Sequence, residues 1–200
     1  MWDIAIIVYL IIMVLTLIPV IKAVLSKVEL HPGGDSFNDS PHFSDSGKFL
    51  LNQHYTRIRG TLGFWKNQAE KYKRFHYYCM YWTIPVSILV PILIQAANPG
   101  DSSKLLITIM SSHTAILFAF HRGFKVERNY KSFRHGESEF YDTYRRLLDR
   151  PYEFGEVESQ QIDAYFKQVE LIRKFVRNAE TDNLPAIEDS RGEGVSAQRN

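Results

Sequence analysis

The sequence predicts an all-α membrane protein: an N-terminal transmembrane helix, a two-span hairpin extended into long antiparallel cytoplasmic helices, and a C-terminal helix. Residues 2–25 are almost wholly apolar, and residues 81–97 and 105–120 carry no Asp, Glu, Lys or Arg. Because about 20 apolar residues cross a bilayer as a helix, we expect three spans, at 1–27 and near 81–97 and 104–121. The last two each adjoin a polar stretch whose apolar residues repeat at alternating steps of three and four.

Basic residues beside the spans predict their orientation. They follow the first span, precede the second and follow the third: Lys22, Lys27, Lys66, Lys71, Lys73, Arg74, Arg122, Lys125, Arg128, Lys131 and Arg134. The positive-inside rule therefore places the N-terminus outside and the C-terminus in the cytoplasm. A cleaved signal peptide is the alternative for the first span, but Trp2 and Asp3 stand where basic residues should precede it, and the apolar run is too long. We expect a retained anchor.

The two polar stretches each predict a helix with one narrow apolar seam. We call these two helices the first and the second stalk. The first seam is Leu51, Tyr55, Ile58, Leu62, Trp65, Ala69, Tyr72, His76 and Cys79, and the second is Val126, Tyr130, Phe133, Glu137, Phe140, Tyr144 and Leu147. This spacing is typical of helices that pack knobs into holes. With the chain reversing at Asn98-Pro99-Gly100-Asp101, Trp65 should lie near Glu137 and His76 near Lys125. Trp65, Phe133 and Glu137 are therefore predicted helix-packing residues.

The domain organisation follows from these patterns. We expect an anchor at 1–27, a flexible linker at 28–47, a helical hairpin domain at 48–180 and a disordered tail at 181–200. The first stalk should start near Ser46 and run unbroken into the second span, with kinks at Pro85 and Pro91. The third span should flow into the second stalk, which should end near Arg150 because Pro151 disfavours helical geometry in the residue before it.

Two further features concern packing within the cytoplasmic part. Gly136 lies inside the second stalk, where it should be either a weak point or a site of close contact. The last helix should fold back on the stalks or join a neighbouring subunit through one apolar face, made of Ile162, Tyr165, Val169, Ile172 and Val176.

The sequence offers little for enzyme chemistry. It has no glycine-rich phosphate loop, no His-Glu-x-x-His and no Gly-x-Ser-x-Gly, and its single cysteine, Cys79, excludes an intramolecular disulfide and a cysteine-based zinc site. We expect no catalytic residues, no metal and no cofactor; the alternative is convergence of His54, Glu137 and Asp142 in a stalk cleft. A net charge of +2 is too small to indicate a nucleic-acid binder.

Polar residues inside the two hairpin spans are the candidates for function. Thr83, Ser87, Pro91 and Gln95 lie one helical turn apart and form a candidate pore lining, to which Thr108 and Ser112 add a second strip. The alternative is that these hydroxyls bond to carbonyls of their own helix. Small residues at Ser111, Ala115 and Ala119 form a ridge that suits close helix packing. We call this set the small-residue ridge, and the set from Thr83 to Gln95 the polar stripe.

His113 lies near the middle of the third span, on another face. It is a candidate gate or pH-sensitive element, or else a neutral histidine hydrogen-bonded to a neighbouring helix.

Local runs within residues 48–180 resemble the SLATT superfamily, a group of bacterial two-transmembrane effector domains of nucleotide-signalling defence systems. The runs are Tyr55-x-Arg57 through Trp65-x-x-x-Ala69-x-x-x-Lys73, and Tyr130-x-x-Phe133-Arg134-x-x-Glu137. The chain departs from that pattern by its added first span and linker, and by having no fused sensor domain.

The resemblance implies a homo-oligomeric effector in the bacterial inner membrane, in contact with membrane lipid. It is expected to form a pore in antiphage defence when a cytoplasmic sensor protein or a nucleotide messenger activates it. The alternative is a non-conducting anchor or scaffold that presents coiled-coil helices to a cytoplasmic partner.

Overall fold

The computed structural model describes residues 2–30, 36–97 and 102–182, and within these ranges the regular structure is helical, without a strand. The predicted all-α class is thereby confirmed. The elements are α1 (Trp2–Leu25), η1 (Phe37–Asp39), α2 (Asp45–Ala96), α3 (Ser103–Gly123), α4 (Val126–Asp149), η2 (Pro151–Phe154) and α5 (Glu158–Asp182).

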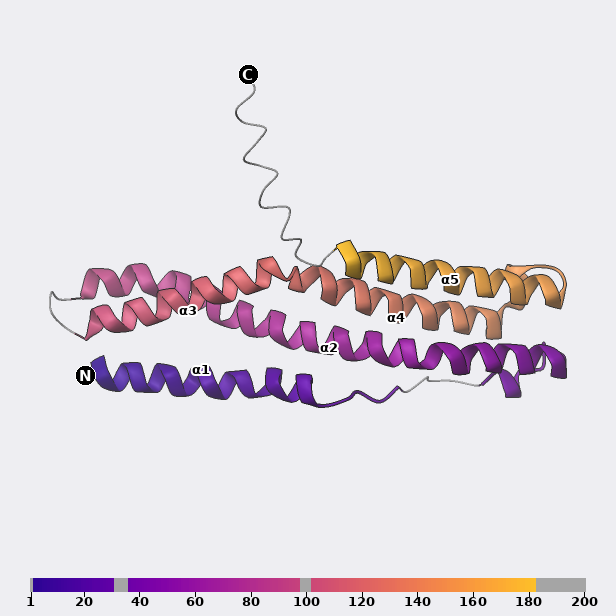
Figure 1. Cartoon of the computed structure of the whole chain (residues 1–200), viewed down its shortest axis with the longest axis horizontal. Coiled ribbons are helices and arrows are strands. Elements are labelled where there is room, and N and C mark those ends of the chain that lie inside the picture. The colour runs from indigo at the N-terminus through magenta and orange to yellow at the C-terminus, as the bar shows by residue number, and fades with distance from the viewer. Residues whose placement is uncertain (1, 31–35, 98–101, 183–200) are drawn as a thin grey trace, which may run out of the picture.

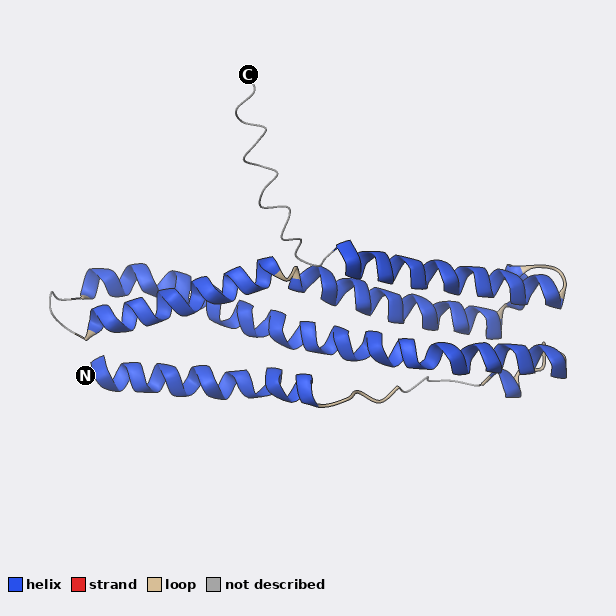
Figure 2. Cartoon of the chain, in the orientation of Figure 1, coloured by secondary structure: helices blue, strands red, loops and turns tan. Residues whose placement is uncertain are grey.

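Helix α2 extends along the whole elongated molecule (Figure 1). It has 52 residues, which at 1.5 Å per residue correspond to about 78 Å. Helices α1 and α3 lie beside its C-terminal half, and α4 and α5 lie beside its N-terminal half. The colouring in Figure 2 shows how little of the described chain lies outside the helices. The molecule thus has an apolar half, made of the predicted spans, and a polar half, the stalk.

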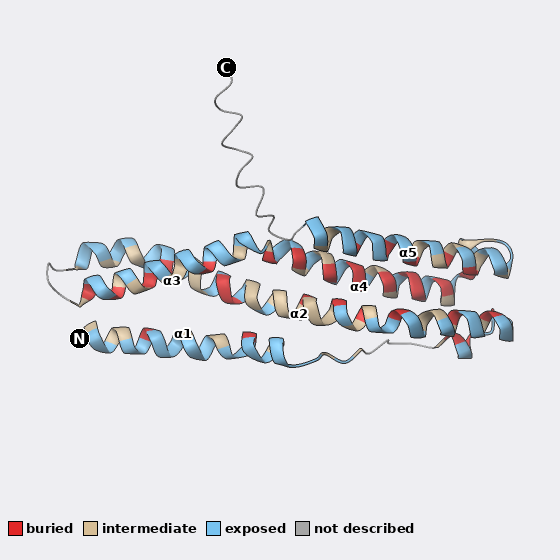
Figure 3. Ribbon diagram, viewed as in Figure 1, coloured by how far each residue is buried: buried red, intermediate tan, exposed pale blue. Residues whose placement is uncertain are grey.

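The stalk is held together by the apolar seam between α2 and α4. Leu51, Leu62, Phe140 and Leu147 are fully buried in it, and Figure 3 shows the buried positions of α4 along its inner face. The predicted register is close to the observed one. A Cβ at Gly136 would lie 3.5 Å from the Trp65 ring, one residue from the predicted neighbour Glu137.

At the membrane end of the stalk, the Nδ1 atom of His76 lies 2.8 Å from Nε2 of His121. His121 is one helical turn before Lys125, the neighbour that the sequence predicted.

The first stalk helix begins slightly earlier than predicted. Its cap is Ser44, whose hydroxyl accepts a hydrogen bond from the Gly47 amide at 3.2 Å; Ser46 lies inside the helix. The Ser44 hydroxyl also donates to the Glu158 carboxylate at 2.6 Å. Since Glu158 is the first residue of α5, the cap also holds the start of α5 against the start of α2.

The prediction of one continuous helix from the third span into the second stalk was wrong. Helix α3 ends at Gly123, and Lys125 adopts left-handed backbone geometry with φ of 45° before α4 begins. The Asn129 side-chain amide donates to the Phe124 carbonyl at 2.9 Å. This side-chain bond satisfies a carbonyl that the broken helix leaves without its usual partner.

Helix α5 folds back along the stalk. This is the first of the two arrangements expected for the last helix, the other being contact with a neighbouring subunit. Its predicted face, Ile162, Tyr165, Val169, Ile172 and Val176, is buried in the same core as the seam. Helix α4 ends at Asp149, one residue before the predicted end, and Pro151 opens the 3-10 turn η2 that leads to α5.

The described residues between α1 and α2 are anchored to the stalk. Phe37 and Phe43 are buried in its core, and Leu30 packs against that core. The Lys66 ammonium donates to the Glu29 carbonyl at 2.7 Å. The predicted turn at 98–101, residues 31–35 of the predicted linker and residues 183–200 of the predicted tail lie outside the described residues.

Three helices, α1, α2 and α3, are long and apolar enough to cross a membrane. Large apolar side chains point outward on all three, among them Ile4, Ile11, Leu15, Ile18, Ile84, Ile88, Ile92, Leu105, Ile116 and Phe118. A surface of this kind is far larger than a water-exposed apolar patch of a soluble monomer. It fits a hydrocarbon environment.

The first span packs on the hairpin in two clusters. One comprises Tyr9 with Val86, Leu106 and Met110. The other comprises Val20 with Tyr78, Cys79 and Leu117, so that the Cys79 thiol is a packed core group. Helix α2 continues through Pro85 and Pro91 without a break; the predicted kinks remain a prediction.

Replacing Gly136 with alanine should destabilise the stalk. The added Cβ would lie 2.2 Å from Cγ2 of the buried Val176, and overpacking of this kind costs about 1–3 kcal/mol. Gly60→Ala is the matched control, because nothing lies within 4 Å of the added atom and alanine favours a helix by about 1 kcal/mol. Thermal unfolding in nanodiscs should show a lower midpoint for G136A and an equal or higher one for G60A. Equal midpoints for G136A and wild type would contradict the close contact.

Candidate functional site

His113 joins all three spans through hydrogen bonds. Its Nδ1 atom lies 2.8 Å from the Tyr9 hydroxyl of α1, and its Nε2 atom lies 3.4 Å from the Tyr78 hydroxyl of α2. Both ring nitrogens thus face a tyrosine that can donate or accept, as the tautomer requires. The alternative of a histidine hydrogen-bonded to neighbouring helices describes these contacts; a gating role stays a prediction.

Trp82 of α2 extends this polar cluster toward the middle of α1. Its ring lies edge-on to Tyr9 and His113, at centroid distances of 5.0 and 5.3 Å. Its indole N–H donates to the Thr16 hydroxyl at 2.9 Å, and that hydroxyl donates in turn to the Ile12 carbonyl at 2.7 Å. The cluster gives α1 a fixed rotation against the hairpin, since apolar packing in lipid has little directionality of its own.

The two predicted features of the hairpin spans meet in one outward-facing groove. Its volume is about 580 Å³, and its lining combines the α2 stripe with the small-residue ridge of α3: Thr83, Ile84, Val86, Ser87, Val90, Pro91, Ser111, Thr114, Ala115 and Phe118. Of the other candidates, Gln95, Thr108, Ser112 and Ala119 are exposed on the same two helices outside this lining.

Three hydroxyls along these spans donate to carbonyls of their own helices. Ser87 donates to Ile84 O at 2.8 Å, Thr114 to Met110 O at 2.9 Å and, outside the groove, Thr108 to Lys104 O at 2.9 Å. This was the alternative considered for the polar stripe. The hydroxyl oxygens of Ser87 and Thr114, which belong to the groove lining, keep acceptor capacity, so their hydrogen bonds are compatible with a polar path along the groove.

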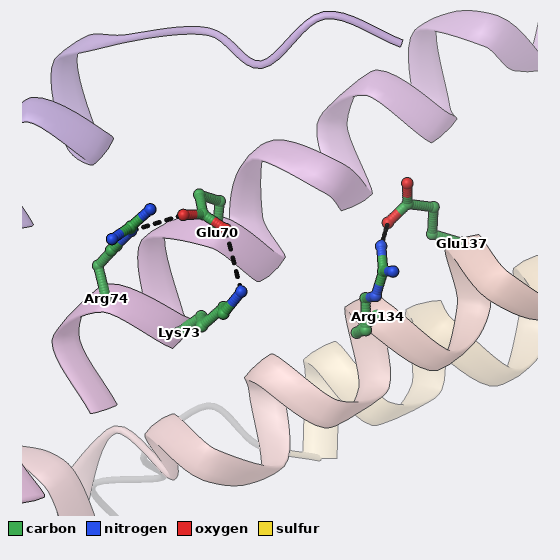
Figure 4. Close-up of polar contacts among 5 residues, drawn as sticks. All are labelled: Glu70, Lys73, Arg74, Arg134 and Glu137. Atoms are coloured by element: carbon green, nitrogen blue, oxygen red, sulfur yellow. Dashed lines mark hydrogen bonds and ion pairs between the residues drawn. The ribbon is translucent and has the colours of Figure 1, made fainter. Parts of the chain in front are cut away.

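Charged pairs lie on the stalk helices, and Figure 4 shows those of Glu70 and Glu137. Glu137 is only 5% exposed and accepts a hydrogen bond from the exposed Arg134 at 2.7 Å. Glu70 lies 2.6 Å from Arg74 and 3.9 Å from Lys73. The pairs of Glu70 are exposed enough that each contributes little to stability. The Glu137 pair neutralises a charge inside the seam.

A cleft between α2 and α5 contains His54. The imidazole stacks on Phe166 at a centroid distance of 4.4 Å, and Arg57 and Arg173 line the same cleft. Burial, followed by the two guanidinium charges, lowers the pKa of His54 below its usual value. Glu137 and Asp142, which the sequence considered together with His54, do not line this cleft. Among the described residues, no group of three or more His, Cys, Asp or Glu side chains could hold a metal ion.

Sequence reasoning missed the roles of Tyr9, Tyr78 and Thr16. Each is a polar residue within or next to an apolar span, which is the signal that could have singled them out. Tyr9 and Thr16 find their partners, His113 and Trp82, only through the packing of α1 on the hairpin, and Tyr78 finds His113 only through the packing of α2 on α3. The sequence does not predict the register of either contact.

Comparison with known families finds one matching model. Residues 62–137 match the family described as protein of unknown function, DUF4231. The matched region runs from the middle of the first stalk through both hairpin spans to the middle of α4. No curated protein and no solved structure matches the chain.

Replacing Tyr9 with phenylalanine should weaken the attachment of α1. The change removes the hydroxyl that bonds to His113 and keeps the ring; such hydrogen bonds in membranes contribute about 0.6 kcal/mol on average and about 1.7 at most. Tyr81→Phe is the control, since Tyr81 lies in the same half of the molecule and is 75% exposed. In nanodiscs, Y9F should lower the unfolding midpoint and Y81F should leave it unchanged. Equal shifts in both variants would contradict a structural role for this bond.

The stability of the stalk should fall as the pH drops below the usual histidine pKa. Folding lowers the pKa of His54 below 6.5, so this imidazole binds a proton more readily in the unfolded chain than in the folded one. The free energy of unfolding therefore decreases as the pH falls through the usual histidine pKa. His54→Phe keeps a ring to stack on Phe166 and removes the titration. Between about pH 8 and pH 5, unfolding midpoints of wild type should fall relative to those of H54F. Parallel curves would show that His54 does not contribute.

Proposed function

We propose that this protein is an oligomeric effector of the bacterial inner membrane that forms a pore in antiphage defence when a sensor protein or nucleotide messenger activates it. The groove between α2 and α3 carries the proposal. Thr83, Ser87 and Ser111 place hydroxyls along a hollow on the outer side of the hairpin. Polar groups at such positions in a membrane protein face a bundle interior or a water-filled path more often than lipid.

Several copies are needed to turn this groove into a pore. The described part of a single chain has three candidate spans, and the groove opens on the outside of the hairpin rather than between all three. Packing of neighbouring copies would bring several grooves around one axis. Ser111 and Ala115, which line the groove, are small enough to let helices approach closely at that contact.

The stalk supplies a route by which a cytoplasmic signal could act. Helix α2 is continuous from the Ser44 cap to Ala96, so tilting or rotating its stalk part would move Thr83 and Ser87. The break between α3 and α4 at Phe124 and Lys125 lets the second stalk change direction without the same rigid connection. The chain therefore has one rigid and one jointed connection between stalk and spans.

Orientation and setting complete the proposal. With the basic flanks of the spans inside, the N-terminus lies on the outer side of the inner membrane, and α4 and α5 lie in the cytoplasm. The resemblance to the SLATT superfamily supports the defence role, and the DUF4231 match covers both hairpin spans and parts of both stalks.

A non-conducting anchor is the second candidate, and one surface feature favours it. Large apolar side chains remain exposed on the stalk, namely Phe49, Leu50, Phe64, Leu171 and Phe175. A cytoplasmic partner could cover them. In that case the spans would only fix the stalk to the membrane.

The mass of the purified complex in nanodiscs distinguishes the two candidates first. After correction for bound lipid, a closed assembly of about four or more copies is expected for a pore, since a closed ring needs repeated heterologous contacts. A monomer or dimer that stays so under activating conditions would favour the anchor.

Leucine substitutions in the groove should abolish permeability of the assembled protein. Ser87→Leu with Ser111→Leu places two apolar groups in the groove lining. Thr108→Leu with Ser112→Leu is the matched control, because it makes the same kind of change on the exposed surface outside that lining. Ion efflux from liposomes is expected to stop in S87L/S111L and to continue in T108L/S112L. Loss of ion efflux only in T108L/S112L would place the pore lining at Thr108 and Ser112 instead of the groove. A non-conducting anchor would show no efflux in wild type or in either double variant.

A further inference from the structure

A small basic pocket lies where α3 ends and α4 begins. Its volume is about 260 Å³, and it is lined by His121, Arg122, Lys125, Glu127 and Arg128. Three of these residues carry a positive charge at neutral pH and one carries a negative charge. The pocket is distinct from the groove between the spans.

The negative charge of the pocket is already compensated from outside it. Lys131 lies 2.5 Å from the Glu127 carboxylate and does not line the pocket. Lys125 donates to the Asp182 backbone carbonyl at 2.7 Å, a neutral acceptor that leaves its charge in place. Among the ion pairs formed by the described residues, neither Arg122 nor Arg128 has a carboxylate partner.

The backbone gives this pocket its shape. Lys125 adopts the left-handed conformation between two helices, and α4 starts directly after it. The first amides of α4 lack partners within their own helix, and that end of the helix carries a partial positive charge. His121 is held in place by His76, with 2.8 Å between their ring nitrogens. The basic side chains make the pocket electropositive, because the backbone contribution of the α4 start is opposed by the partial negative charge at the end of α3.

The position of the pocket relative to the membrane indicates its ligand. It directly follows the third candidate span, which ends at Gly123. Phe118, Phe120 and Phe124 are exposed on the same stretch, and the rings of Phe120 and Phe124 stack at a centroid distance of 5.7 Å. Exposed Phe side chains favour the hydrocarbon core, and basic residues that directly follow a span favour the headgroup region, so the membrane–water boundary falls within this stretch. The Arg122 guanidinium lies over the Phe118 ring at 5.9 Å, which places it at the same boundary.

We propose that this pocket binds the phosphate of an anionic phospholipid headgroup. Arg122 and Arg128 would contact the phosphate oxygens, because guanidinium groups bind phosphate through paired hydrogen bonds. The phenylalanines would contact the upper part of the acyl chains. Lys125 also donates a hydrogen bond to Asp182, the last described residue of α5. The bound lipid would therefore lie where α3, α4 and α5 meet. The proposal does not depend on pore formation.

Lipid binding to the delipidated full-length protein in a neutral detergent tests the proposal. Native mass spectrometry would count bound short-chain phosphatidylglycerol, with phosphatidylcholine and inorganic phosphate at the same concentrations as comparison probes. Each basic residue near an anionic lipid contributes about 1 kcal/mol. The double variant R122Q/R128Q should therefore weaken phosphatidylglycerol binding about 20- to 30-fold and bind phosphatidylcholine as wild type does.

The matched control is R59Q/R145Q, which removes the same charge from two exposed arginines of the stalk that line neither this pocket, nor the His54 cleft, nor the groove. It should bind phosphatidylglycerol as wild type does. Equal weakening in both double variants, or equal binding of the two lipids to wild type, would overturn the proposal. Displacement of phosphatidylglycerol by an equal concentration of inorganic phosphate would also overturn it, in favour of a soluble phosphate ligand. If R122Q/R128Q unfolds at a lower temperature than the control, the single variant R128Q provides the test, because Arg128 is exposed and forms no ion pair among the described residues.

Discussion

The apolar seam between α2 and α4 is the contact on which the other elements depend. It fixes the register of the two stalks, and α5 and the segment around Phe37 and Phe43 pack on the core that it forms. Apolar burial drives this contact in water. The same helix α2 continues into the lipid-facing half, where that driving force is absent and the spans are held by van der Waals packing together with hydrogen bonds between helices.

The two halves therefore use different interactions to solve the same packing problem. In the stalk, interlocking side chains such as Trp65 and Val176 around Gly136 leave no room for a methyl group. In the spans, hydrogen bonds among Tyr9, His113 and Tyr78 orient α1 against the hairpin. The break at Lys125 lies between the stalk and the spans. At this point α3 and α4 are joined neither by a continuous helix nor by a common core.

This arrangement relates the proposed pore and the proposed lipid site without making one depend on the other. The groove lies on the span part of α2 and α3, and the basic pocket lies at the end of α3, one step from the stalk. A lipid bound at Arg122 and Arg128 would stabilise the joint between spans and stalk. A protein that acts on a membrane in this way would respond to the lipid composition around it.

The sequence by itself determined the helical class, the three apolar segments, both seams and the buried face of α5, because these follow from apolar spacing along one helix. It left Gly136 as either a weak point or a close-contact site, and it separated the polar stripe from the small-residue ridge. Tertiary structure alone decided what these features meet. The groove exists because Ser87 and Ser111 belong to neighbouring helices, and the partners of His113 come from two other elements. At the break around Lys125, the side chain of Asn129 donates to the Phe124 carbonyl, a contact that periodicity does not encode. Spacing predicts which face of a helix is buried; only packing shows which residues face each other across it.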